Sequence, residues 1–100
     1  MSNLVFVRFF PKTGAEEKVR KILQNMVVNT RTEPGCTLYN LYQTTGPSGN
    51  SIFCLAERYT GDAGLQAHRD TDYYKDYRAN IMDLLDAPIE VNILSAIDEI

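Results

Sequence analysis

The chain has 100 residues, of which 44% are hydrophobic and 23% charged, and its formal net charge is −3 at pH 7. This composition is typical of a single folded domain over residues 1–100 and excludes the low-hydrophobicity class of disordered chains. The acidic balance disfavours nucleic acid and anionic membranes as main partners, because both attract basic surfaces. No signal-peptide pattern and no apolar run of transmembrane length is present, so we expect a cytoplasmic protein.

The N-terminal third predicts a strand followed by a long helix. Residues 4–10 are β-branched and aromatic on both faces, which is typical of a strand that needs cover on both sides. Residues 13–16, Thr-Gly-Ala-Glu, have the form of a capping box, and apolar residues recur at helical spacing over residues 19–30. Pro34 and Gly35 predict the turn that ends this helix.

The next segment predicts a β-hairpin with strands at residues 36–43 and 51–59, because the loop between them consists of turn-forming residues. In the predicted register Asn40 lies opposite Cys54. Cys36 is then four residues, or about 13 Å, away along the strand, which is too far for a disulfide. We therefore predict two free thiols.

Two short helices and a last strand are predicted in the C-terminal part. Thr60 can cap a first helix that carries Leu65 and His68 on one side, and Thr71 can cap a second helix. A proline stops the second helix, and alternating residues 89–94 predict the final strand.

The order of these elements predicts the fold. Strand, helix, strand, strand, helices, strand is the ferredoxin-like βαββαβ arrangement, an α+β fold with a four-stranded antiparallel sheet. The helices cover one face of such a sheet, and the other face here carries apolar residues alongside Arg8, Glu90 and Asn92. We expect this open face to pack against a second copy, giving a twofold homodimer. A monomer with scattered apolar surface residues is the alternative.

Two stretches resemble the antibiotic biosynthesis monooxygenase (ABM) family. Residues 31–42, Arg-Thr-Glu-Pro-Gly-Cys-Thr-Leu-Tyr-Asn-Leu-Tyr, are similar to the motif that leaves that family's first helix and enters its second strand. Residues 57–59, Glu-Arg-Tyr, followed by Leu65, His68 and Tyr74, resemble its Glu-x-aromatic strand end, its Leu-x-x-His helix and a later aromatic residue. With the order of the elements, the resemblance covers most of the chain.

The resemblance implies a dimeric α+β barrel with a pocket between sheet and helices in each subunit. The family includes cofactor-independent monooxygenases of quinols and phenols, a haem-degrading branch, and a branch that isomerises a phosphorylated sugar-like signal. The haem-degrading branch uses an Asn on the first strand, a pocket Trp and an axial His. This chain has Val7 and Arg8 on that strand, no Trp, and Arg78 near the axial position, which argues against haem degradation. Tyr59 stands where the family more often has Trp.

His68 is the predicted catalytic residue, and Tyr59, Tyr74 and Asn40 are the predicted substrate-binding residues. His68 shares a helix side with Leu65, and an imidazole that titrates near neutral pH can accept a phenolic proton. A structural histidine bonded to a backbone carbonyl is the alternative. Tyr59 and Tyr74 match the family's motif and would line an aromatic slot, whereas packing alone explains most tyrosines. Asn40 offers a polar group at the hairpin.

No metal site and no cofactor are predicted. A lone histidine is too few for a histidine-rich metal site, and the glycines lack the strand–turn–helix context of a phosphate loop. Arg8 and Arg58 could meet an anionic substrate, but salt bridges with Glu57 or Glu90 across the sheets are the favoured interpretation.

The predicted function is that of a cofactor-independent monooxygenase. Its substrate would be a small quinol, phenolic or enolisable ring bound between sheet and helices. Because such a substrate can donate an electron to oxygen once it is deprotonated, the protein has to hold it, remove a proton and exclude water. An isomerase of a small carbonyl compound and a non-catalytic dimeric binding module are the alternatives. Oxygen uptake separates the first function from the other two.

Overall fold

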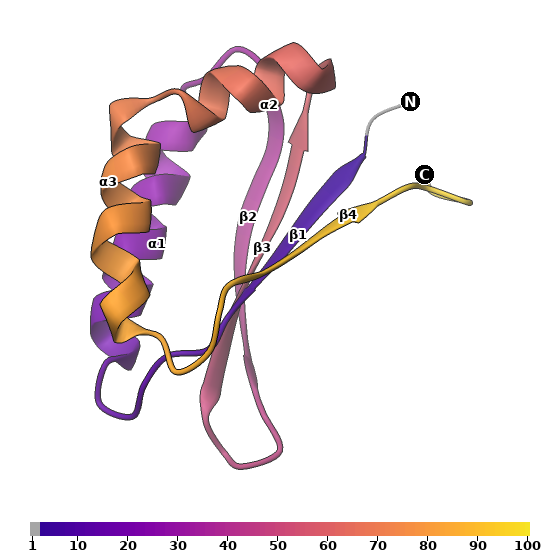
Figure 1. Cartoon of the computed structure of the whole chain (residues 1–100). Helices are drawn as coiled ribbons and strands as arrows, with labels where there is room; N and C mark the ends of the chain where they lie inside the picture. The colour runs from indigo at the N-terminus through magenta and orange to yellow at the C-terminus, as the bar shows by residue number, and fades with distance from the viewer. Residues whose placement is uncertain (1–2) are drawn as a thin grey trace.

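The computed structural model describes residues 3–100 and has the predicted order of elements. These are β1 (Leu4–Phe9), α1 (Glu16–Thr30), β2 (Cys36–Thr45), β3 (Ser51–Tyr59), α2 (Gly61–Arg69), α3 (Asp72–Ile81), the short 3-10 helix η1 (Met82–Leu84) and β4 (Glu90–Leu94). The strands form one antiparallel sheet in the order β2-β3-β1-β4. Figure 1 shows the helices on one face of this sheet, with α1 and α3 side by side. The predicted ferredoxin-like α+β fold is confirmed.

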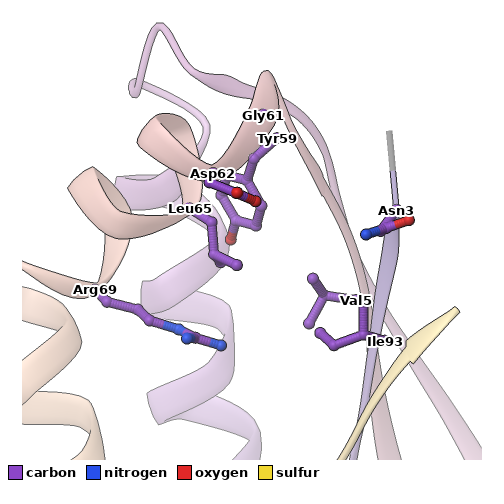
Figure 2. Close-up of a pocket in the computed structure, with 8 residues that line it drawn as sticks. All are labelled: Asn3, Val5, Tyr59, Gly61, Asp62, Leu65, Arg69 and Ile93. Carbon is purple, nitrogen blue, oxygen red and sulfur yellow. The ribbon is translucent and has the colours of Figure 1, made fainter. Parts of the chain in front are cut away.

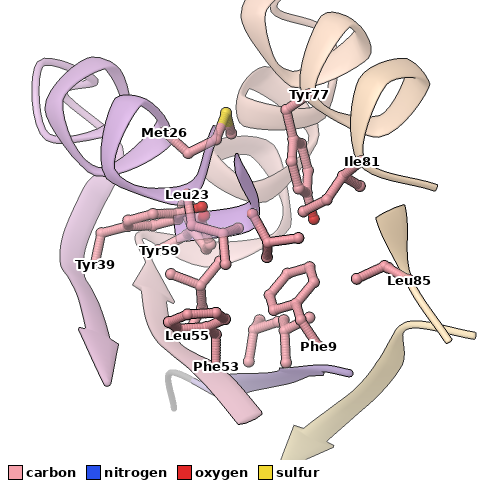
Figure 3. Close-up of a cluster of buried hydrophobic side chains, with 13 residues drawn as sticks. Phe9, Leu23, Met26, Tyr39, Phe53, Leu55, Tyr59, Tyr77, Ile81 and Leu85 are labelled. Carbon is pink, nitrogen blue, oxygen red and sulfur yellow. The ribbon is translucent and has the colours of Figure 1, made fainter. Parts of the chain in front are cut away.

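The hydrophobic core lies between the sheet and the helices. Alternation along β1 points Val5, Val7 and Phe9 toward the helices, where each side chain is at most 5% exposed. Burying one large apolar side chain of this kind contributes roughly 1.5–3 kcal/mol, so this layer fixes the helices on the sheet. The cluster, drawn in Figure 3, comprises Val5, Val7, Phe9, Val19, Leu23, Met26, Tyr39, Phe53, Leu55, Tyr59, Tyr77, Ile81 and Leu85.

The start of α1 differs from the predicted capping box. Ala15 is the N-cap residue, and no side chain caps the helix, so the expected role of Thr13 is wrong. Glu16 does turn back, and its carboxylate accepts a hydrogen bond of 2.7 Å from the Gly14 N–H. Gly14 has φ of 91°, a left-handed conformation that glycine adopts without steric cost. The N-cap position therefore lies two residues after the predicted one, at Ala15 instead of Thr13.

The two caps predicted in the C-terminal part have different outcomes. The Thr71 hydroxyl accepts a hydrogen bond of 3.2 Å from the Tyr74 N–H, which confirms the predicted cap of α3. The Thr60 hydroxyl does not cap α2. It donates instead to the Gly35 carbonyl at 3.4 Å, because α2 begins against the turn that follows α1.

The hairpin register is shifted from the predicted one. Cys54 lies opposite Tyr42 and not opposite Asn40. The reason is the turn: the Gly49 N–H donates to the Gly46 carbonyl at 3.0 Å, so the turn centres one position later than expected. The prediction of two free cysteines is nevertheless confirmed.

The fold leaves two regions of apolar surface. The sheet face away from the helices includes Tyr42 and Leu94, which are 54% and 45% exposed. On the helix-facing side, the edge strand β4 extends beyond the helix layer, so that Val91 and Ile93 are 46% and 49% exposed. Among residues 3–100, no helix combines the length and apolar composition that crossing a bilayer requires.

Candidate active site

A pocket opens where the helix layer ends, between α2 and the β1–β4 edge of the sheet (Figure 2). Its volume is about 270 Å³. It is lined by Asn3, Val5, Tyr59, Gly61, Asp62, Leu65, Arg69 and Ile93. This volume is close to the lower end of the range for ligand pockets, so it suits a small molecule.

A narrower space of about 20 Å³ adjoins this pocket on the core side. The two cavities share Val5, Leu65 and Arg69 in their linings. The inner space adds the titratable side chains of Glu57 and His68. It is large enough for a group the size of a water molecule. The chemistry-bearing residues of the site therefore lie at the inner end of the pocket.

His68 is held by a partly buried carboxylate, that of Glu33. The His68 side chain is 2% exposed, and its Nδ1 lies 2.9 Å from Oε2 of Glu33, in the turn between α1 and β2. The Tyr73 hydroxyl donates a hydrogen bond to the same carboxylate oxygen. An ionised Glu33 places the imidazole proton on Nδ1 and leaves Nε2 as the acceptor nitrogen. The alternative of a histidine bonded to a backbone carbonyl is not what the structure shows.

Tyrosine rings enclose the imidazole. The ring centroids of Tyr59 and Tyr74 each lie 5.1 Å from that of His68, and the centroid of Tyr39 lies 5.8 Å from it. Tyr74 in turn packs edge-on against Tyr77. Burial raises the pKa of Tyr59 and of Tyr39, so both hydroxyls stay protonated and can act as hydrogen-bond donors at neutral pH.

Glu57 is a second carboxylate at this site, and it is buried. Its side chain is 5% exposed and accepts a hydrogen bond of 2.6 Å from the Tyr59 hydroxyl. Burial raises its pKa to about 7, while the Tyr59 hydrogen bond and the positive charge of Arg69 act in the opposite direction. A carboxyl group with such a pKa can both accept and return a proton near neutral pH.

The expected salt bridges are only partly found. Arg8 pairs with Glu90 at 3.4 Å, as predicted, but Arg58 pairs with Glu99 at 2.6 Å, and neither contacts Glu57. The reason is strand parity, because Glu57 points to the helix side of β3 while both arginines point to the other face. That parity was the signal in the sequence that could have identified Glu57 as a buried site residue.

The structure brings together three of the four predicted site residues. His68 and Tyr74 line the inner cavity, and Tyr59, which lines the outer pocket, packs against the His68 ring. Asn40 is not among them, because it alternates with the buried Tyr39 and so points away from the helices. Its amide there contacts Arg31 and Tyr42, each at 3.2 Å. Glu33 and Glu57 are among the residues that the sequence reasoning did not assign to the site.

Comparisons with known proteins agree with this architecture. The family described as "Antibiotic biosynthesis monooxygenase" matches residues 4–80. The protein named "Putative monooxygenase Rv0793" from Mycobacterium tuberculosis is 37% identical over 95 residues, which cover 95% of this chain and 91% of that protein. Its solved structure superposes with a TM-score of 0.87 at 35% identity, covering 99% of this chain and 98% of the other.

More distant matches include a second relative in sequence and a structure with the same fold. "Putative monooxygenase YcnE" from Bacillus subtilis is 28% identical over 80 residues, 80% of this chain and 82% of that protein. A structure from Nitrosomonas europaea has a TM-score of 0.83 at 20% identity, covering 96% of this chain and 90% of the other. The resemblance found in the sequence is confirmed, and the chain belongs to the antibiotic biosynthesis monooxygenase family.

Proposed function

We propose that this protein is a cofactor-independent monooxygenase of a small quinol, phenolic or enolisable substrate. The observation that carries the proposal is the hydrogen bond between Glu33 and His68 at the inner end of a ligand-sized pocket. It orients an imidazole so that Nε2 can accept a proton, as a general base requires. The relatives named as monooxygenases support the same class of reaction.

The proposed mechanism begins with a proton transfer. His68 Nε2 removes the proton of a substrate hydroxyl, and the resulting anion gives one electron to oxygen. The substrate radical and superoxide then combine into a peroxide anion, which takes back the proton held by His68 and becomes a hydroperoxide. The hydroperoxide loses water and leaves a carbonyl on the ring. Atoms and electrons balance with oxygen as the only co-reactant, so the protein supplies binding, proton transfer and exclusion of water.

Four residues support this step in the proposal. Glu33 and Tyr73 are positioning residues, because they act on the substrate only through His68. Tyr59 and Tyr74 form the walls on two sides of the imidazole. Aromatic walls suit a planar ring, which packs against them by stacking or edge contacts.

Glu57 is proposed as the second proton carrier. Loss of water from the hydroperoxide needs a proton delivered to the leaving oxygen. Glu57 lines the inner cavity together with His68, and its pKa of about 7 lets it return a proton there. The hydrogen bond from Tyr59 fixes the orientation of its carboxyl group.

The proposal includes a homodimer. The open sheet face carries Leu4, Phe6 and Tyr42 beside the ion pair of Arg8 and Glu90. Large exposed apolar patches are rare on monomers, and two copies can cover each other about a twofold axis. Face-to-face packing of two such sheets would form the α+β barrel that the family resemblance implies.

Oxygen consumption with and without His68 tests the function. With small quinols as substrates, the protein should raise oxygen uptake above the autoxidation rate, and His68→Ala should lower turnover about 10²-fold or more. Tyr74→Phe is the matched control, because it keeps the ring and removes only a hydroxyl, so its effect should be smaller.

Two results would contradict the proposal. One is a folded His68→Ala protein that oxidises the substrate as fast as the parent. The other is anaerobic conversion of an enolisable carbonyl compound without any oxygen uptake, which would instead indicate an isomerase that uses the same base. Thermal stabilisation by ligands without turnover of either kind would indicate a binding module.

A further inference from the structure

Arg69 occupies a distinctive place in the site. It is the last residue of α2 and lines both the outer pocket and the inner space. Figure 2 shows its side chain extending from the helix into the pocket. It follows His68 directly in the sequence, so the two residues present an imidazole to the inner space and a guanidinium to the junction between the two cavities.

The charge of Arg69 is not neutralised by an ion pair within residues 3–100. The ion pairs found there join Arg8 to Glu90, Arg20 to Glu17, Arg58 to Glu99 and His68 to Glu33. A guanidinium stays charged at every ordinary pH, and a charge at a cavity wall favours a ligand of opposite sign. Arg78, which lines the inner space, has no such partner in the described part of the chain either.

The acidic groups that face the cavities form no ion pair with Arg69, although its positive charge lowers the pKa of Glu57. Asp62 lies at the outer pocket and Glu57 at the inner space, and neither is within ion-pair distance of Arg69 in residues 3–100. Glu57 is in addition only partly ionised at neutral pH, because burial raises its pKa to about 7. The junction of the two cavities is therefore suited to an anion, although the whole chain carries a net charge of −3.

We propose that Arg69 binds a permanent anionic group of the substrate, so that the substrate class is a small ring acid: a quinol or phenol that carries a carboxylate. The inference rests on the proposed function and names the substrate class of that same site. The carboxylate lies at the junction of the cavities, where the planar guanidinium can donate two parallel hydrogen bonds. The ring hydroxyl then points inward, to His68 and Glu57. A pocket of about 270 Å³ matches a ligand of one or two rings.

Anaerobic calorimetry with a pair of probes tests the proposal. The probes are 2,5-dihydroxybenzoate and 2,5-dihydroxybenzamide, which differ in charge and have nearly the same shape. The parent protein should bind the acid about tenfold or more tightly than the amide, as expected for charge-assisted hydrogen bonds. Arg69→Gln keeps a hydrogen-bonding side chain without the charge, and it should reduce this ratio to about one.

Lys75→Gln is the matched control, because it removes one positive charge from an exposed position of α3 outside the linings of both cavities. It should keep the parent's preference for the acid. The proposal is overturned by equal binding of both probes to the parent, by an unchanged preference in Arg69→Gln, or by no binding of either probe.

Oxygen uptake with the same acid separates this inference from the function on which it rests. A preference for the acid that depends on Arg69, without any oxygen consumption, would keep the anion site and overturn the monooxygenase. Oxygen consumption with neutral quinols by a protein that has no preference for the acid would keep the monooxygenase and overturn the anion site.

Discussion

Glu57 shows how one residue can be costly to the fold and useful to the chemistry. Glu57 is only 5% exposed, and its carboxylate accepts a hydrogen bond from the Tyr59 hydroxyl. Its pKa is raised from 4.5 to about 7, so the folded state binds a proton that the unfolded state has already lost between those pH values. The fold is therefore less stable where this carboxyl group is ionised.

This shift predicts a pH-dependent effect of Glu57→Gln. Since the folded pKa is raised, the contribution of Glu57 favours folding below about pH 4.5 and is lost as the pH rises to about 7. The glutamine can still accept the Tyr59 hydrogen bond but cannot ionise. The free energy of unfolding of the variant minus that of the parent should therefore increase from pH 5 to pH 8, by up to roughly 3 kcal/mol.

Urea unfolding of both proteins at the two pH values, at one protein concentration, measures this difference. Other carboxyl groups titrate equally in both proteins and cancel. Stability curves of parent and variant that run parallel between pH 5 and pH 8 would show that Glu57 does not titrate as the structure indicates.

At the scale of secondary structure, the break between α2 and α3 is maintained by Thr71. Its hydroxyl accepts from the Tyr74 N–H at 3.2 Å and donates to the His68 carbonyl at 2.8 Å. Thr71→Ala should therefore lower the free energy of unfolding by about 1 kcal/mol, the usual cost of losing an N-cap.

Thr60→Ala is the comparison for this prediction, because Thr60 precedes α2 without capping it. Chemical denaturation should show a loss for Thr60→Ala of less than half that for Thr71→Ala. Equal losses for the two variants would mean that the cap of α3 contributes no more to stability than an uncapped threonine does.

The start of α2 is packed directly against the turn that carries Glu33. A Cβ on Gly64 would lie 3.0 Å from the Gly35 carbonyl oxygen, a tight contact that the backbone of Gly35 would have to relieve by moving a few tenths of an ångström. Gly64→Ala should separate α2 from this turn. It should cost about 1–3 kcal/mol of unfolding free energy, despite the better helix propensity of alanine, and should lower turnover by disturbing the bond between Glu33 and His68.

Ala63→Ser, at the exposed neighbouring position on α2, is the control and should change neither quantity appreciably. Denaturation and oxygen uptake measured on the same preparations check both parts of the prediction. Full activity in a Gly64→Ala protein would show that the close contact does not position the histidine.

The same contact explains what the sequence could and could not predict. Periodicity along each element predicted the order of strands and helices, and helical spacing placed His68 on the buried side next to Leu65. It could not predict the partner of His68, because Glu33 lies 35 residues away and meets it only through the packing of α2 on the turn. Asn40 was assigned to the site from its type, while the alternation of β2 points it to the other face.

For the whole molecule, the open sheet face predicts a homodimer. Light scattering on a sizing column should give twice the mass of one 11.3 kDa chain. Phe6→Glu, in the middle of the open face, should give a folded monomer, because two buried carboxylates would face the apolar interface.

Val28→Glu is the matched control for the dimer. It adds the same charge at a residue of α1 that is 68% exposed, and it should leave the dimer intact. Circular dichroism shows whether each variant is folded. A parent protein that stays at the mass of one chain at micromolar concentration would exclude the sheet-to-sheet dimer.

The position of β4 has a further consequence for how a substrate reaches the pocket. This strand pairs only with β1, and all five of its residues are exposed, yet Ile93 forms part of the pocket wall. Local fluctuations of a protein begin where few buried contacts oppose them. One wall of the pocket is thus formed by β4, the strand of the sheet with the fewest buried contacts. The pocket entrance can therefore widen when β4 frays from β1, while the core between β1, β3 and the helices stays intact.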